Sequence, residues 1–161
     1  MLTLGLPFID SLTQAAGGKV RVLAWAEHGL APEVGYAVAL LESFAFCADG
    51  AWTFIDWAQI DRGSWNGAQK TLNVVVADGR KYQFAFAAPG QLPEVFVERV
   101  NASIVFAHNL EIDGHRAVIS KRRSLAKGAG QGEWRVTAAV GLDPSDPSLL
   151  AELERLRAEF E

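Results

Sequence analysis

The 161-residue chain has one cysteine, Cys47, and few histidines. A single cysteine can form neither an intrachain disulfide nor the cysteine cluster of a structural zinc site. Long apolar runs are also missing, because none reaches the roughly 18–20 residues that a membrane-spanning helix needs. The first residues lack the basic start of a secretory signal. We therefore expect a cytoplasmic protein without integral membrane association and without a cofactor.

Positive charge is scarce as well. Fifteen Lys and Arg against 19 Asp and Glu give a net charge of −4. A general nucleic-acid binder usually carries a basic surface, so we expect no nucleic-acid partner. Half of the residues are apolar, which excludes a disordered chain. The length suits one domain, with or without a tail.

The apolar pattern predicts a mainly β domain that ends in a helix. A short helix is predicted over 7–16, with Gly17 and Gly18 ending it. Strands are predicted over 20–25, 36–47, 52–57 and 59–65, followed by a hairpin around Asp78. From Leu92 to Ile104 the apolar residues follow the i, i+3, i+4 spacing of an amphipathic helix. The middle of the chain thus has about six antiparallel strands and one helix.

The tripeptide Ala-Asp-Gly occurs at 48–50 and at 77–79, each time between strand-like runs. A three-residue loop at 77–79 pairs Val74 with Tyr82 and keeps apolar residues on one face, whereas a one-residue slip would turn them to the wrong face. It also pairs Val76 with Arg80 and Leu72 with Phe84. The same loop at 48–50 pairs Phe46 with Trp52 and Phe44 with Phe54. We predict three-residue loops in both hairpins.

The last third of the chain predicts a smaller β unit and a helix. Strands over 106–112 and 115–121 flank Asp113-Gly114, and a two-residue turn there pairs Leu110 with Ala117 and Glu111 with Arg116. Another strand is predicted over 134–140. The final helix begins at Asp146-Pro147 as N-cap and first-turn proline. Its apolar stripe consists of Leu149, Leu153, Leu156 and Phe160.

Four segments carry a family resemblance. KVRVLAWA (19–26), WTFIDW (52–57), IDRGSW (60–65) and LPEVFVERV (92–100) resemble the strands and capping helix of PH-like (pleckstrin-homology-like) domains in small uncharacterised bacterial proteins. The resemblance implies an α+β, mainly β fold: an antiparallel barrel or sandwich of six to seven strands capped by one amphipathic helix, with a β-hairpin and C-terminal helix appended.

This resemblance also implies a division of the chain. Residues 1–18 form an N-terminal helical segment, 19–105 the PH-like barrel, and 106–161 C-terminal strands and a helix packed on the same domain. In eukaryotic PH domains, Lys and Arg around the loop between the first two strands bind phosphoinositides. The corresponding loop here, 27–34, contains neither residue, so we do not expect phosphoinositide binding.

No catalytic or metal-binding residues are predicted. His108 and His115 lie close in sequence, with Glu111 and Asp113 between them, but the predicted hairpin separates the two histidines by roughly 13 Å, too far to share one ion. The chain has no Gly-x-Ser-x-Gly motif. We interpret Cys47 as a small buried apolar residue. Asp56 and Asp61, the nearest candidates for a carboxylate pair, are interpreted as solvated loop acids.

Two candidate binding surfaces remain. The first is the basic segment Lys121, Arg122, Arg123 and Lys127 with Trp134 nearby. It suits an acidic partner, RNA or an anionic membrane surface, or else keeps a hairpin tip in water. The second is a peptide groove between a strand and the amphipathic helix, as in strand addition to PH-like barrels. Its candidate residues are Leu72, Val74, Val76, Phe96 and Val100.

These surfaces lead to three functional hypotheses. The first is a non-enzymatic binding or scaffolding module that recognises a protein or peptide. The alternative is a binder of a small apolar ligand, or an enzyme, that uses the barrel interior near Phe44, Phe54 or Phe84. The third is a homodimer formed through the C-terminal helix.

Overall fold

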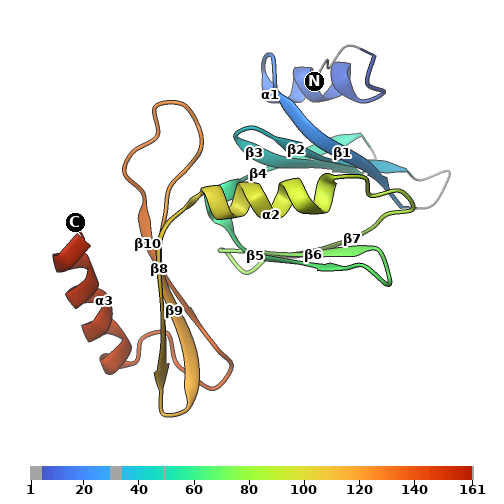
Figure 1. Ribbon diagram of the computed structural model, residues 1–161. Helices are drawn as coiled ribbons and strands as arrows, with labels where there is room; N and C mark the ends of the chain where they lie inside the picture. Colours follow the sequence, from blue (N-terminus) through green and yellow to red (C-terminus); the bar gives the residue numbers. More distant parts are fainter. Residues whose placement is uncertain (1–4, 30–33, 49, 161) are drawn as a thin grey trace. The chain divides into compact units, whose positions relative to one another are not determined.

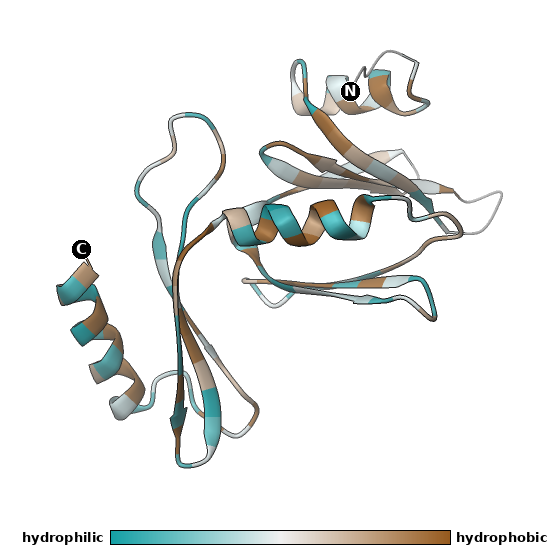
Figure 2. Cartoon of the chain, viewed as in Figure 1, coloured by the Kyte–Doolittle hydropathy of each residue, from teal (hydrophilic) through white to brown (hydrophobic). Residues whose placement is uncertain are grey.

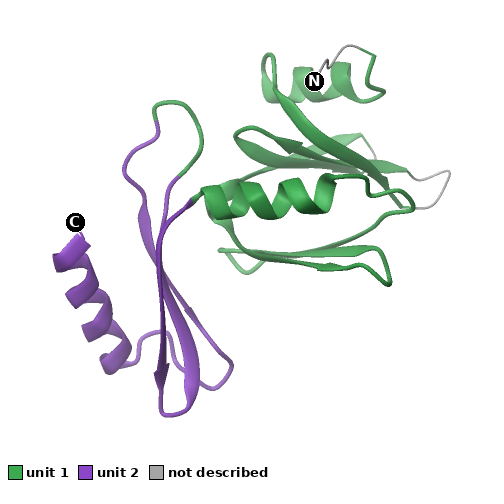
Figure 3. Cartoon of the chain, viewed as in Figure 1, with its two compact units in different colours: residues 1–103, 124–128 green, residues 104–123, 129–161 purple. Residues whose placement is uncertain are grey.

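The computed structural model describes residues 5–29, 34–48 and 50–160 and shows an α+β, mainly β protein (Figure 1). These residues form three antiparallel sheets and three α-helices. The chain divides into two compact units (Figure 3). Unit 1 consists of residues 1–103 and 124–128, and unit 2 of residues 104–123 and 129–161. The packing of 106–161 on the same domain stays a prediction.

The described residues of unit 1 form seven strands in two sheets, and neighbouring strands are consecutive in the chain. The four-stranded sheet holds β1 (Val22–His28), β2 (Gly35–Leu40), β3 (Ser43–Ala48) and β4 (Ala51–Asp56). The three-stranded sheet holds β5 (Ile60–Asn66), β6 (Thr71–Val76) and β7 (Lys81–Ala85). An isolated antiparallel bridge between His28 and Phe86 joins the end of β1 to the residue after β7.

The described part of unit 1 also has three helical segments. They are α1 (Ile9–Ala16), the 3₁₀ turn η1 (Trp57–Gln59) and α2 (Leu92–Ala102). Gly17 ends α1 in the left-handed conformation (φ 79°), and the Gly18 N–H donates to the Thr13 carbonyl, as expected for a glycine C-cap. Helix α2 packs against β1, β2 and β5 and so contacts both sheets.

The space between the sheets is filled by aromatic rings. The ring of Phe44 lies 5.1–5.8 Å from those of Phe46, Trp57, Phe84 and Phe96. The indole N–H of buried Trp57 donates to the Leu40 carbonyl (2.9 Å), which satisfies the one polar group of this side chain. A second cluster, which includes Leu12 of α1 and Val38 of β2, covers the other face of the four-stranded sheet.

The three-residue loop predicted for both Ala-Asp-Gly hairpins is present in only one of them. At 77–79 the predicted three-residue loop is confirmed: Val74 pairs with Tyr82, and the Val76 N–H donates to the Arg80 carbonyl (2.9 Å). At 48–50 the prediction is wrong, because Cys47 pairs with Trp52, one residue out of the predicted register. Asp49 itself lies outside the described residues. Strand β3 is buried on both faces, so either register buries apolar side chains and the alternation argument cannot choose.

The single long strand predicted over 36–47 is also wrong. The chain bends at Leu41 and Glu42, so that β2 and β3 form a hairpin in which Ala39 pairs with Phe44. Neither turn residue is a glycine or a proline, and the apolar run is nearly continuous through β2 and β3. The residue types at 41 and 42 therefore do not indicate a turn.

Unit 2 is a three-stranded sheet with a helix. It contains β8 (Ile104–Ile112), β9 (His115–Arg122), β10 (Glu133–Ala138) and α3 (Pro147–Phe160), with β9 in the centre. The predicted two-residue turn at Asp113-Gly114 is confirmed, since Leu110 pairs with Ala117. Hydrophobic and hydrophilic residues alternate along α3 (Figure 2), and its Leu149 and Leu156 are buried in the core of unit 2.

Asp146 caps α3 as predicted. Its carboxylate accepts hydrogen bonds from the N–H groups of Ser148 (2.9 Å) and Leu149 (3.4 Å). In the part of the chain that the structure describes, no helix combines the length and the apolar character that crossing a membrane requires.

Candidate functional site

Half of the cations in the predicted basic segment are buried in the fold. Lys121 and Arg122 end β9 with only 9% and 7% of their surface exposed. The Lys121 ammonium group lies 5.7 Å from the centre of the Trp134 ring, a cation–π contact within unit 2. Arg123 is exposed in unit 2, and Lys127 is exposed in unit 1. Two of the four cations are therefore structural, and the segment does not present its whole charge to solvent.

The predicted groove residues lie inside unit 1. Five side chains proposed to line the groove are buried in its main core cluster: Leu72, Val74, Val76, Phe96 and Val100. Strand β6, which carries three of them, pairs with β5 on one side and with β7 on the other. A peptide cannot add to a strand that is already paired on both sides. An added strand could therefore bond only to an outer strand of this sheet, β5 or β7.

Strand β5 is one of the two outer strands of its sheet, with β7 at the opposite edge. The β5–β6 register shows which backbone groups of β5 face outward. The Val76 N–H donates to the Arg80 carbonyl, so even-numbered residues of β6 direct their backbone groups toward β7. Odd-numbered residues of β6 then bond to β5, and Ser64 is the partner of one of them. Because successive residues of a strand alternate sides, Gly63 and Trp65 direct their N–H and C=O groups toward the outer edge.

Helix α2 runs beside this edge. A side chain on Gly63 would lie 2.2 Å from the Phe96 ring, so the absence of a side chain there lets α2 approach β5. The Arg99 guanidinium lies 3.5 Å from the Leu41 carbonyl, on the side of α2 that faces the four-stranded sheet. At about 100° per residue, Val97 is about 160° around the helix from Arg99. Val97 thus lies on the side of the three-stranded sheet, 43% exposed.

Neither Cys47 nor Asp56 is arranged for catalysis. Burial raises the pKa of the Cys47 thiol, whereas a nucleophilic cysteine needs a lowered one. The His28 imidazole Nε2 bonds to the Cys47 carbonyl (2.9 Å), and the ring packs against Phe84. The Asp56 carboxylate accepts hydrogen bonds from the Ala58 N–H and the Ser124 hydroxyl. These contacts cap η1 and hold the segment 124–128 within unit 1.

Two other predictions concern metal and lipid. Among the described residues, no three His, Cys, Asp or Glu side chains gather closely enough to hold a metal ion. His108 is instead 3.5 Å from Glu152 of α3. Residues 30–33, in the loop between β1 and β2 on which the phosphoinositide expectation rests, lie outside the described residues, as do residues 1–4.

Sequence reasoning missed the edge position of β5 and the exposure of Val97. Both depend on strand order and on the rotation of α2, which alternation along the chain does not encode. It also missed a cavity beside α1, because the cavity's residues come from three separate segments of the chain. One sequence signal was available: Gly63 lies inside the strand predicted over 59–65, and a glycine within a strand often marks a close approach of another segment.

Comparison with known proteins adds little. No family model matches the chain, and no curated protein matches it. One similar solved structure is the C-terminal domain of an unknown protein from Leishmania infantum. It is 14% identical, with a TM-score of 0.45, and the match covers 58% of this chain and 94% of that one.

Proposed function

We propose that the chain is a PH-like, non-enzymatic binding module that holds an extended segment of a protein partner against β5, beside α2. Two features support the PH-like assignment: sheets of four and three consecutive antiparallel strands, and a helix after the seventh strand that contacts both sheets. A cytoplasmic location belongs to the same proposal.

One observation carries the binding function: the outer edge of β5 combines outward backbone groups with an apolar helix side chain. Gly63 and Trp65 offer the N–H and C=O groups that an added strand would bond. Val97 is an exposed apolar side chain of α2, the helix that approaches β5 at Gly63. In strand addition, backbone hydrogen bonds provide affinity and side-chain contacts provide specificity. The partner segment is therefore expected to be extended, with an apolar residue directed toward α2.

The alternative function, a small apolar ligand inside the barrel, has less support. Phe44 and Phe84 are in direct contact within the core, with ring centres 5.7 Å apart. Phe54 of β4 lies on the face of the four-stranded sheet opposite to Phe44 and is 37% exposed. The three aromatic residues therefore do not line one internal pocket. Self-association through α3 is a further alternative, although Leu149 and Leu156 of its apolar stripe are already buried within unit 2.

The test is a selection of extended peptides followed by a charge placed at the proposed contact. Peptides would be selected from a displayed random library on the full chain, and their affinity measured by fluorescence anisotropy. Val97→Glu should weaken the selected peptides about tenfold or more, because it puts a charge against an apolar contact. Leu150→Glu is the matched control, since Leu150 is also helical and is 42% exposed in unit 2.

Two results would contradict the proposal. The first is peptides that lose affinity equally in both variants. The second is a selection that yields no peptide with measurable affinity for the folded chain. Circular dichroism of both variants checks that each retains its fold.

A further inference from the structure

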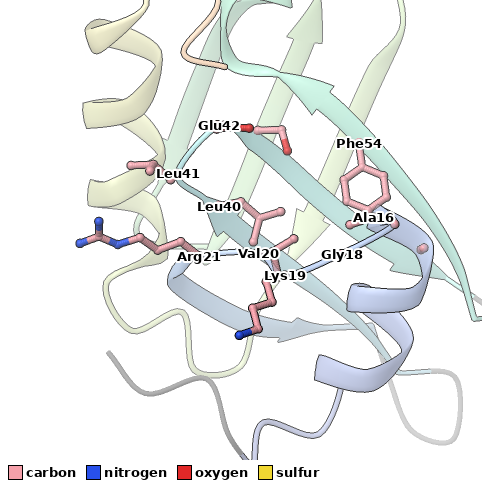
Figure 4. A pocket seen from close by; sticks show the side chains of 12 residues that line it. Ala16, Gly18, Lys19, Val20, Arg21, Leu40, Leu41, Glu42 and Phe54 are labelled. Carbon is pink, nitrogen blue, oxygen red and sulfur yellow. The ribbon is translucent and has the colours of Figure 1, made fainter. Parts of the chain in front are cut away.

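A cavity of about 620 Å³ lies on unit 1, away from β5. It is formed where the end of α1 and the residues that lead into β1 meet the turn between β2 and β3 (Figure 4). In this view Leu40 and Val20 lie near the centre and Phe54 of β4 lies on the right. The side chain of Lys19 points downward, and that of Arg21 extends to the left, away from Phe54. Its volume falls within the 300–1,000 Å³ typical of small-molecule sites.

The lining combines exposed apolar side chains with positive charge. Leu41 and Phe54 are 36% and 37% exposed, and both line this cavity. Lys19 and Arg21 bring two positive charges, and Glu42 brings one negative charge. The Glu42 carboxylate also accepts a hydrogen bond from the Lys127 backbone N–H (3.2 Å). The cavity therefore has a local charge of +1 in a chain whose net charge is −4.

We propose that this cavity binds a small organic anion with an aromatic body. The aromatic ring would lie against Phe54 and Leu41, and the anionic group would lie between Lys19 and Arg21. An aromatic ring prefers to meet Phe54 edge-on or offset, and removing exposed apolar surface from water favours the contact. The two cations supply charge-assisted hydrogen bonds to a carboxylate or sulfonate. The site is independent of the β5 edge and of any protein partner.

Gly18 provides a way to close the cavity without disturbing the fold. A side chain on Gly18 would meet nothing within 4 Å, and its φ lies outside the left-handed region. Gly18→Phe should therefore fold normally while filling part of the cavity. Gly130 shares both properties in the loop of unit 2, so Gly130→Phe is the matched control.

The experiment is a fluorescence titration of the full chain with 1-anilinonaphthalene-8-sulfonate, an aromatic anion. Gly18→Phe should lower its affinity about tenfold or more, whereas Gly130→Phe should leave it unchanged. The double variant Lys19→Glu/Arg21→Glu should also weaken binding about tenfold, because it reverses the charge that faces the sulfonate. Raising the salt concentration should weaken binding to the native chain more than to this double variant.

Amide chemical shifts provide the structural readout. The probe should shift the amide signals of Lys19, Arg21, Leu41 and Phe54 in the native chain. Equal affinity in the native chain and in Gly18→Phe would overturn the proposal, as would shifts confined to other parts of the chain. Loss of binding in Gly130→Phe to the same extent as in Gly18→Phe would also contradict it.

Discussion

The ring of Phe96 occupies the space where a side chain on Gly63 would project, 2.2 Å from the position of its Cβ. Helix α2 can approach β5 only because residue 63 has no side chain. This one contact joins the capping helix to the strand that forms the proposed binding edge. It also lies inside the aromatic core, since Phe96 contacts both Phe44 and Trp57.

Gly63→Ala should therefore destabilise unit 1. A methyl group at that position must displace the Phe96 ring or the helix, and overpacking of this kind costs roughly 1–3 kcal/mol. Urea unfolding followed by tryptophan fluorescence would measure the change. Gly67→Ala is the control, because its added carbon would lie at an ordinary 3.6 Å from Trp65. Equal stability of the two variants would show that the packing of α2 on β5 does not require residue 63 to lack a side chain.

His28 should make stability depend on pH. Burial lowers the pKa of His28 below its usual 6.5, and the hydrogen bond to the Cys47 carbonyl only partly offsets this. The folded state therefore favours the neutral imidazole. The neutral imidazole's contribution to the free energy of unfolding is complete above about pH 6.5. It is lost as the pH falls below that value toward the lowered pKa of His28.

The measurement for His28 is urea unfolding at pH 7.5 and at pH 5.5. The native chain should lose more stability between the two than His28→Gln, which does not titrate. An equal or larger loss in His28→Gln would show that other groups cause the acid sensitivity.

Lys121 and Arg123 should respond differently to the same substitution. Lys121 is buried against Trp134, so Lys121→Glu removes a cation–π contact and buries a carboxylate against the ring. We expect a loss of roughly 1–3 kcal/mol in the free energy of unfolding. Arg123 is exposed, and Arg123→Glu should change stability by less than about 0.5 kcal/mol. Thermal unfolding of both variants compares them, and similar destabilisation would argue against a structural role specific to Lys121.

The two Ala-Asp-Gly hairpins show what the sequence could predict. Strand β6 alternates buried and half-buried residues, so only one register keeps Leu72, Val74 and Val76 in the core. In β3, Phe44 to Cys47 are all buried, because a second cluster covers its other face. Alternation sets the register only where one face of a strand meets solvent.

The candidate sites were harder to predict than the fold. The amphipathic pattern from Leu92 placed α2 correctly, with its end at Ala102 in place of Ile104. The same pattern could not show which sheet strand lies at the edge. Likewise, Phe54 and Lys19 are 35 positions apart in the chain. They line one cavity only because β1, β2, β3 and β4 pair in succession to form one sheet.

Hydrogen exchange at the backbone of β5 tests the central claim most directly. A selected peptide bound by strand addition should slow amide exchange at Gly63 and Trp65, whose N–H groups face the outer edge. The Ser64 amide, already directed to β6, should change little. A peptide that binds the folded chain and leaves the Gly63 and Trp65 amides unprotected would contradict recognition at this edge.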